Sequence, residues 1–272
     1  MAIQWKKYIF TINEIYGETD FANRLSKADM HTYYQQKKPI NIEKRLTIHK
    51  RVLTLCIDLH KSEEMLRKEM NRTTRYQINR AGKDELNVTL ITSPTNKDID
   101  EFVGFFNPFA KEKGIELCRV DRVKALKESG MLVISYVFHK DGRKLASHLY
   151  ITNGTRAVML YSCSGRFESS DVPTIEVGRA NRYLHWQDIL FFKEKEYRYY
   201  DFLGLSIDKN DHNQQNINKF KKGFGGEEIT EYCSYIPQTW KGKLLILLLK
   251  IKWRDQLEII HRREYLTYKC GV

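Results

Sequence analysis

Residues 181–226, with the sequence NRYLHWQDILFFKEKEYRYYDFLGLSIDKNDHNQQNINKFKKGFGG, decide the fold of this chain. An amphipathic helix that carries His185 and Trp186 leads into an apolar, buried-type strand at residues 198–202. A polar loop follows, and then a second helix that runs into a glycine-rich end at residues 220–226. A lone FGG would carry no information, but the fixed order of these elements is informative.

The segment before this stretch predicts a three-stranded antiparallel meander followed by a helix at about residues 178–195. Its turns are Asp-Gly and Asn-Gly dipeptides, which favour tight hairpins. The predicted strands are residues 131–138, 145–152 and 156–162.

A capping-box pattern, Thr95 with Asp98, predicts the start of another helix, which we take as the first helix of a second domain. Apolar residues then recur at helical spacing. They are Ile99, Phe102, Val103 and Phe106. Pro108 is expected to end or kink this helix.

A further helix is predicted from the Ser62 cap to Gly82, after a strand at residues 51–57. Lys68, Arg72 and Arg75 recur along it at i, i+4 and i+7, which places three cations on one face. The face is either an ordinary solvated surface or a phosphate-binding one, and the sequence leaves both interpretations open.

The order of a helix with Trp, then Y-D-F-x-G, then F-K-x-x-F-G resembles the C-terminal half of the FemABX family of aminoacyl and peptidyl transferases. The resemblance covers about residues 59–236. It implies an α+β, GNAT-like acyltransferase fold with two GNAT-like domains, of which the first is reduced. The implied domains are residues 1–94, completed by 237–272, and residues 95–236.

Two residues match the chemistry of that family. Lys221 occupies the lysine position of F-K-x-x-F-G, where the resemblance implies a fixed cation beside the reacting carbonyl. Asp201 is the aspartate of Y-D-F and is implied to orient donor or acceptor. The alternative for Asp201 is a structural carboxylate that caps the next loop or pairs with a basic neighbour.

The other candidates are expected to bind substrate. They are Lys68, Arg72, Arg75, His185 and Lys222. His185 lies on an apolar helix and His148 within a strand, and histidines in such places are more often core residues than general bases. Trp186 is expected in the core.

The prediction of the acyl donor depends on a position at which this sequence departs from a known CoA-binding motif. GNAT enzymes that use acyl-CoA have a Q/R-x-x-G-x-G/A loop that holds the pyrophosphate. Gly178 and Ala180 fit its end, but Ile175 stands at the Gln/Arg position. This weakens CoA as the donor, and no metal or other cofactor is expected.

Composition limits the class of protein. The chain has 272 residues, of which 42% are hydrophobic and 29% are charged, so it can bury a sizeable core. Five dispersed cysteines, never in a C-x-x-C pair, indicate neither a disulfide framework nor a zinc site and fit a reducing cytosol. A net charge of +12 favours a polyanionic partner, although the excess can also serve solubility.

Residues 244–249 are all Leu or Ile, but the run is too short to span a bilayer. Lysines and two tryptophans flank it, so residues 240–254 predict either an interfacial helix or a helix that packs against the first domain.

Three hypotheses follow. The leading one is an aminoacyltransferase that uses aminoacyl-tRNA to form an amide on an amine of a cell-envelope precursor, in the cytoplasm or at the inner membrane face. The second is an N-acyltransferase that takes its acyl group from a CoA or carrier-protein thioester and acts on an amino sugar. The third is a non-catalytic module that binds RNA or a membrane surface.

Overall fold

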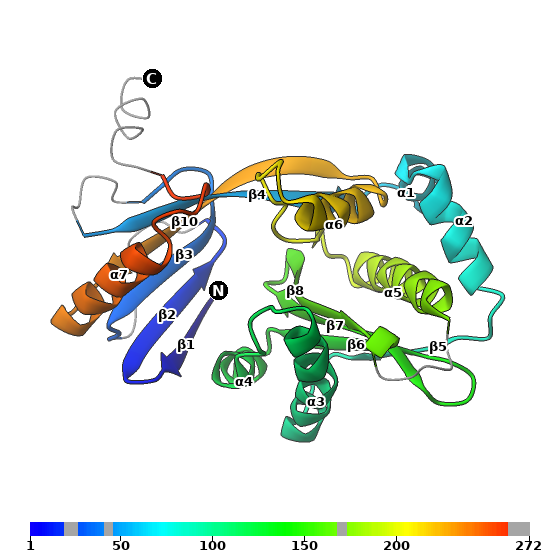
Figure 1. Ribbon diagram of the computed structural model, residues 1–272, viewed down its shortest axis with the longest axis horizontal. Coiled ribbons are helices and arrows are strands. Elements are labelled where there is room, and N and C mark those ends of the chain that lie inside the picture. Colours follow the sequence, from blue (N-terminus) through cyan, green and yellow to red (C-terminus); the bar gives the residue numbers. More distant parts are fainter. Residues whose placement is uncertain (19–26, 41–45, 168–172, 261–272) are drawn as a thin grey trace. The chain divides into compact units, whose positions relative to one another are not determined.

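A computed structural model describes residues 1–18, 27–40, 46–167 and 173–260. The chain divides into two compact units (Figure 1). The first consists of Met1–Thr54, Gly204–Asn216 and Glu228–Val272, and the second of Leu55–Leu203 and Ile217–Glu227. Residues 55–94 thus group with the second unit, whereas the expected division lay at residue 94. Of the segment expected to complete the first domain, residues 261–272 lie outside the described part.

The first unit has a mixed sheet with the strand order β1-β2-β3-β10-β4. The strands are β1 (Ala2–Lys7), β2 (Phe10–Tyr16), β3 (Met30–Gln36), β4 (Ile48–Asp58) and β10 (Glu227–Pro237). β2 and β3 pair in parallel, whereas β1 pairs with β2, and β3 with β10, in antiparallel fashion. Helix α7 (Trp240–Lys252) follows β10 and contacts β2.

The second unit has a sheet in which β9 pairs with the end of β4, followed by β8, β7, β6 and β5. The strands are β5 (Asn87–Ile91), β6 (Leu132–Phe138), β7 (Lys144–Thr152), β8 (Arg156–Ser164) and β9 (Tyr199–Asp201). Only the β8–β9 pair is parallel among these described pairs. The predicted meander is confirmed, and its turn glycines, Gly142 and Gly154, have φ of +86° and +80°.

Helices cover both faces of this second sheet (Figure 1). The helices between residues 63 and 222 are α1 (Glu63–Glu69), α2 (Arg72–Ala81), α3 (Asn96–Glu112), α4 (Val120–Glu128), α5 (Thr174–Glu194) and α6 (His212–Lys222), with a 3-10 turn η1 at Gly165–Phe167. α5 lies on one face with α2 against it, while α3 and α4 lie on the other face. The predicted α+β class is confirmed.

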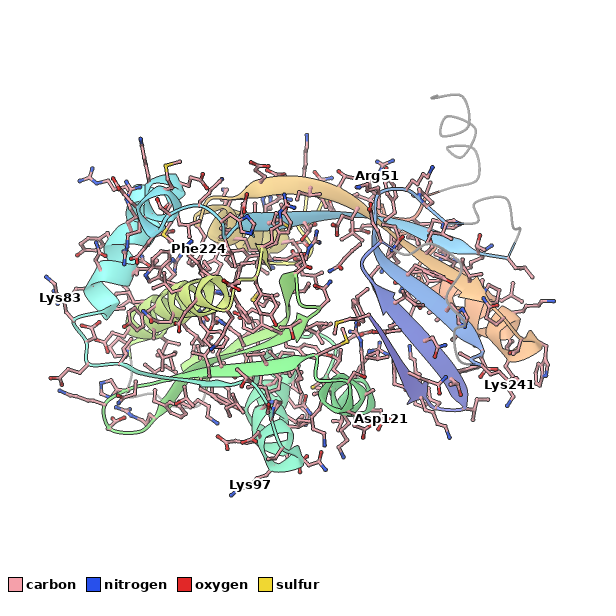
Figure 2. The ribbon with its side chains drawn as sticks, turned by 180° about the vertical axis from the view of Figure 1, so that it is seen from behind. Arg51, Lys83, Lys97, Asp121, Phe224 and Lys241 are labelled. Carbon is pink, nitrogen blue, oxygen red and sulfur yellow. The ribbon has the colours of Figure 1, made fainter. Side chains whose placement is uncertain are left out.

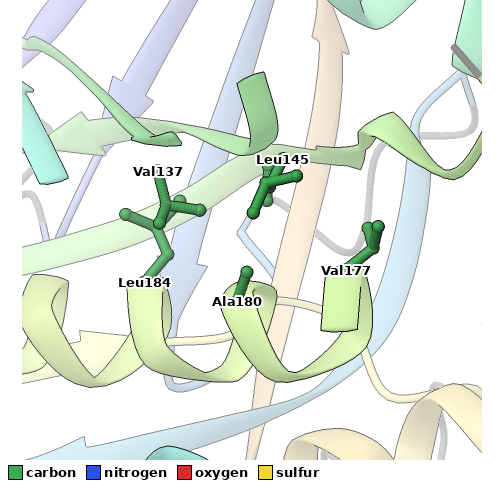
Figure 3. Packing of buried hydrophobic residues seen from close by; sticks show 6 residues of the cluster. Val137, Leu145, Val177, Ala180 and Leu184 are labelled. Atoms are coloured by element: carbon green, nitrogen blue, oxygen red, sulfur yellow. The ribbon is translucent and has the colours of Figure 1, made fainter. Parts of the chain in front are cut away.

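The core between α5 and the sheet follows from helical spacing. Val177, Ala180 and Leu184 recur on one side of α5 and pack against Val137 and Leu145 of the sheet (Figure 3). Fully burying a side chain such as Leu or Val contributes about 1.5–3 kcal/mol. α5 begins at Thr174, earlier than the predicted residue 178, and its Trp186 is buried as expected.

The prediction of one helix from Ser62 to Gly82 is wrong, because α1 ends at Glu69 and α2 begins at Arg72. Met70 between them is extended, and the Asn71 side chain caps α2 by accepting from the backbone N–H of Thr74 at 2.7 Å. The i, i+4, i+7 spacing therefore does not place the three cations on a single helical face.

Pro108 does not end α3, which continues to Glu112. Its missing N–H would have reached the carbonyl of Gly104, and both residues lie on the exposed side of the helix. Water can satisfy that carbonyl, so the proline costs the helix little. The predicted Thr95–Asp98 capping box is confirmed.

Candidate active site

At the end of strand β9, hydrogen bonds connect Asp201, Leu203 and Lys221. Asp201 Oδ1 accepts the backbone N–H of Leu203 at 2.7 Å, and Oδ2 accepts from Arg156 at 3.2 Å. Leu203 has φ of +54°, an uncommon conformation for a side chain of its kind. Its carbonyl accepts a hydrogen bond from Lys221 Nζ at 3.0 Å. Asp201 therefore both binds the backbone of the next loop and pairs with a basic neighbour, the two contacts of a structural carboxylate. It also fixes Leu203, whose carbonyl binds Lys221.

Lys221 is a largely buried cation in the last turn of α6. Burial lowers the pKa of its ammonium to about 8, with Asp201 acting in the opposite direction. The group is therefore still mainly protonated at neutral pH. A desolvated ammonium in a fixed position can stabilise negative charge that develops on a carbonyl oxygen.

The turn after Lys221 is shaped by close backbone approach. A Cβ on Gly225 would lie 2.8 Å from Glu69 Cβ, and one on Gly226 would lie 2.6 Å from the Cys56 carbonyl oxygen. Both glycines also have positive φ, of +84° and +89°. Only glycine fits such positions without strain. Phe224, between them and Lys221, is buried in the interior, whereas Lys83 and Lys97 of the same unit project outward (Figure 2).

The junction of α1 and α2 packs directly on this turn. The backbone N–H of Asn71 donates to the carbonyl of Gly223 at 3.0 Å. The predicted cations Lys68 and Arg72 lie exposed on either side of the junction, close in sequence to Asn71. The structure thus brings the basic segment and the F-K-x-x-F-G segment together.

Arg75 has a structural role at the same junction. Its guanidinium donates to the carbonyls of Arg67, Lys68 and Met70, at 3.1, 3.1 and 2.5 Å. These carbonyls belong to the end of α1, where helical partners are missing. Arg75 therefore caps the C-terminal end of α1. Lys222, the remaining predicted cation, is exposed at the end of α6.

A buried hydrogen-bond network lies between α5 and the sheet. Asp188 Oδ2 accepts from Tyr150 at 2.6 Å, from His148 Nδ1 at 2.7 Å and from Ser135 at 3.0 Å. His148 Nε2 pairs with the Asn181 side-chain amide at 2.9 Å. All but Asn181 are fully buried, so His148 is a core histidine with polar partners.

The network continues to His185. The Tyr200 hydroxyl lies 2.8 Å from that of Tyr150 and 2.7 Å from His185 Nδ1. Because the Asp188 carboxylate only accepts, Tyr150 donates to it and must accept from Tyr200. Tyr200 in turn accepts from His185, so the proton of the neutral imidazole is on Nδ1.

His185 Nε2 is consequently a bare acceptor. It is buried and has no hydrogen-bond partner among the described residues. Burial, followed by the charges of His148, Arg182 and Lys221, holds the pKa of His185 well below its usual range. Phe202, Phe220 and Phe224 pack around the ring, with centroids 5.0–5.5 Å away. The site thus combines a buried neutral imidazole with a largely buried ammonium.

The sequence did not predict Asp188, Tyr150, Tyr200 or Arg182 as parts of this site. Alternation along the strand was the available signal, since Tyr200 and Phe202 share one face and Asp201 takes the other. Within the described residues, no group of three or more His, Cys, Asp or Glu is placed to hold a metal ion.

Comparison with solved structures shows that the fold is shared with known proteins. The chain is similar to the crystal structure of FemX, with a TM-score of 0.60 and 13% identity, covering 90% of this chain and 85% of that one. It is also similar to the C-terminal domain (DUF2156) of a protein assigned as a lysylphosphatidylglycerol synthetase from Agrobacterium fabrum. There the TM-score is 0.51, the identity is 13%, and the coverage is 82% of this chain and 72% of that one.

A conserved protein of unknown function from Bacteroides thetaiotaomicron matches with a TM-score of 0.50 and 11% identity, covering 87% of this chain and 82% of that one. No model of a known protein family matches the sequence, and no curated protein matches it. The chain therefore has the fold that the FemABX resemblance implied, a GNAT-like fold shared with FemX.

Proposed function

We propose that this protein is an aminoacyltransferase that forms an amide on an amine of a cell-envelope precursor, with aminoacyl-tRNA as the donor. The observation that carries the proposal is Lys221, a desolvated ammonium fixed by the Leu203 carbonyl at 3.0 Å in a fold shared with FemX. In the proposed reaction, the acceptor amine attacks the ester carbonyl of the aminoacyl-tRNA. The new C–N bond forms as the C–O bond to the ribose breaks.

Lys221 stabilises the oxyanion that develops on the carbonyl oxygen in this step. The attacking amine loses a proton and the departing ribose oxygen gains one, so the transfer is balanced without a cofactor. Asp201 is assigned a positioning role, because its two oxygens already hold Leu203 and Arg156.

A thioester donor is the second candidate, and the start of α5 argues against it. The first turn of α5 carries Glu176 beside Ile175, which disfavours the pyrophosphate of CoA at that helix end. The acidic first turn therefore favours the tRNA donor over CoA.

A non-catalytic module would have no need of a desolvated ammonium that a backbone carbonyl holds in place.

The direct experiment supplies labelled aminoacyl-tRNA or acyl-CoA together with an amino-bearing envelope precursor and follows acceptor-dependent deacylation. We expect transfer from aminoacyl-tRNA only. Transfer from acyl-CoA alone would show that the donor is a thioester and not aminoacyl-tRNA. Transfer from neither donor would contradict the enzyme proposal and favour the non-catalytic binding module.

The donor surface is tested through the salt dependence of tRNA binding. Lys68 and Arg72 are exposed, whereas Arg75 is held by backbone carbonyls. Replacing Lys68 and Arg72 by Gln should reduce the slope of log K against log salt by about one for each phosphate that is no longer neutralised. Arg75→Gln should instead lower the melting temperature. An unchanged slope in the variant that lacks both Lys68 and Arg72 would show that these side chains do not bind the phosphates of tRNA.

A further inference from the structure

One side of helix α7 packs against the rest of the first unit. Thr239 caps it by accepting from the backbone N–H of Gly242 at 3.2 Å, and donates to Asp29 at 2.6 Å. A Cβ on Gly242 would overlap the Asp29 carbonyl oxygen, so the helix backbone touches the chain there. This side is apolar and buried, with Leu245, Ile246 and Leu249. The helix therefore cannot rotate about its axis without a clash.

The opposite side is apolar as well, and it is exposed. Its large side chains are Trp240 at 71%, Leu244 at 44%, Leu247 at 48%, Leu248 at 51% and Ile251 at 68% exposure. The leucines and Ile251 follow i, i+3, i+4 and i+7 spacing, which makes one stripe. Trp253 does not belong to it, because its ring packs on Tyr235 with centroids 5.2 Å apart and lies under Lys50. Of the two tryptophans that flank the leucine run, only Trp240 is therefore exposed beside the stripe.

Cations border the exposed stripe. The helix contains Lys241, Lys243, Lys250 and Lys252 and no Asp or Glu. Lys241 projects from the helix in Figure 2, and Lys250 and Lys252 are exposed at its other end. An apolar stripe with lysines at both ends and a tryptophan at one end suits an interface between water and anionic headgroups.

We propose that the exposed stripe of α7 binds in the plane of a membrane surface that contains anionic lipid. A helix of 13 residues is about 20 Å long, shorter than the ~30 Å hydrocarbon core. No helix in the described ranges is long and apolar enough to cross a membrane. A second copy of this chain fits less well, because two identical stripes would bring their lysines together. The proposal is independent of the proposed transfer reaction.

The test is flotation of the full chain with phosphatidylcholine vesicles, with and without phosphatidylglycerol. We expect co-flotation only with phosphatidylglycerol and release at high salt. The double variant Leu247→Ser/Ile251→Ser should lower the partition coefficient on the order of tenfold or more, because less apolar surface is buried. The matched control is Ile115→Ser/Leu117→Ser, which removes two apolar side chains of 47% and 45% exposure from another surface.

Trp240 reports the same contact. Its fluorescence should shift to the blue on vesicles with phosphatidylglycerol, and Trp240→Phe should abolish the shift. Far-UV circular dichroism and thermal melting check that the variants fold. Absence of co-flotation, or equal reductions in the stripe variant and its control, overturns the proposal. A concentration-dependent dimer that Leu247→Ser/Ile251→Ser disrupts would assign the stripe to a second copy instead.

Discussion

The imidazole ring of His185 stacks on that of His148, with 4.0 Å between centroids and 28° between planes. Only His148 reaches a carboxylate, through Asp188 at 2.7 Å. His185 instead hydrogen-bonds to the Tyr200 hydroxyl and faces the positive charges of Arg182 and Lys221. Two histidines in contact thus have different electrostatic surroundings, and His185 is held neutral.

Buried neutral histidines should make the fold sensitive to acid. The folded-state pKa is lowered well below 6.5 for His185 and to about 4 for His49, in both cases first by burial. Below pH 6.5 the unfolded chain binds protons that the folded chain does not, so the free energy of unfolding should fall as the pH drops from 6.5 to 4. Urea titrations across this range measure the slope. His49→Gln should flatten it, and an equally steep slope in that variant would contradict the assignment.

Lys221→Met should lower kcat by about 10² to 10³ while the protein stays folded, because it removes a charge that acts on the transition state. Steady-state transfer assays measure the effect. Lys219→Met is the matched control, since it removes an exposed lysine from the same turn of α6. If the two variants are equally impaired, Lys221 has no special role.

The alkaline limb of the transfer rate should report the titration of Lys221. Its pKa of about 8 means that the charged form disappears as the pH rises through that value. We expect kcat to fall above about pH 8 in the wild type. Lys221→Arg should move this limb to higher pH, because a guanidinium stays charged, even where its different shape lowers the rate. A limb that stays in place in Lys221→Arg would belong to another group.

The tyrosine pair inside the network should be energetically coupled. Tyr150→Phe leaves Asp188 one donor short, and Tyr200→Phe removes the partner of His185. Each should lower the free energy of unfolding by about 1–3 kcal/mol. The double variant should cost less than the sum, which a double-mutant cycle with urea unfolding detects. Tyr76→Phe, at an exposed hydroxyl, controls for removal of a hydroxyl group.

Local signals predicted the parts of the fold that depend on local chemistry. Asp-Gly and Asn-Gly placed the turns of the meander, and Thr95 with Asp98 placed the start of α3. The break at Met70 and Asn71 was missed, because neither residue is a strong helix breaker and the cap depends on a side chain that can also lie inside a helix. The prediction that Pro108 ends the helix was wrong, because the proline lies on the exposed side of α3, where water can bind the carbonyl that lacks its N–H partner.

The candidate site divides in the same way. Lys221 and Asp201 could be found because a motif carries them. The network could not, because Ser135, His148, Asp188 and Tyr200 come from four elements, and only the fold brings them within hydrogen-bond distance. No spacing in the sequence predicts such pairs.

Two tyrosine hydroxyls connect His185 to Asp188: that of Tyr200 contacts His185 and Tyr150, and that of Tyr150 contacts Tyr200, Asp188 and, at 3.1 Å, His148 Nδ1. The groups of this chain come from β7, β9 and α5, so its hydrogen bonds also tie the helix to the two strands. Because the chain is buried, the loss of one partner would leave a polar atom unsatisfied. Hydrogen bonds are directional, and they therefore favour one position of α5 along the sheet, which apolar contacts alone would specify less sharply.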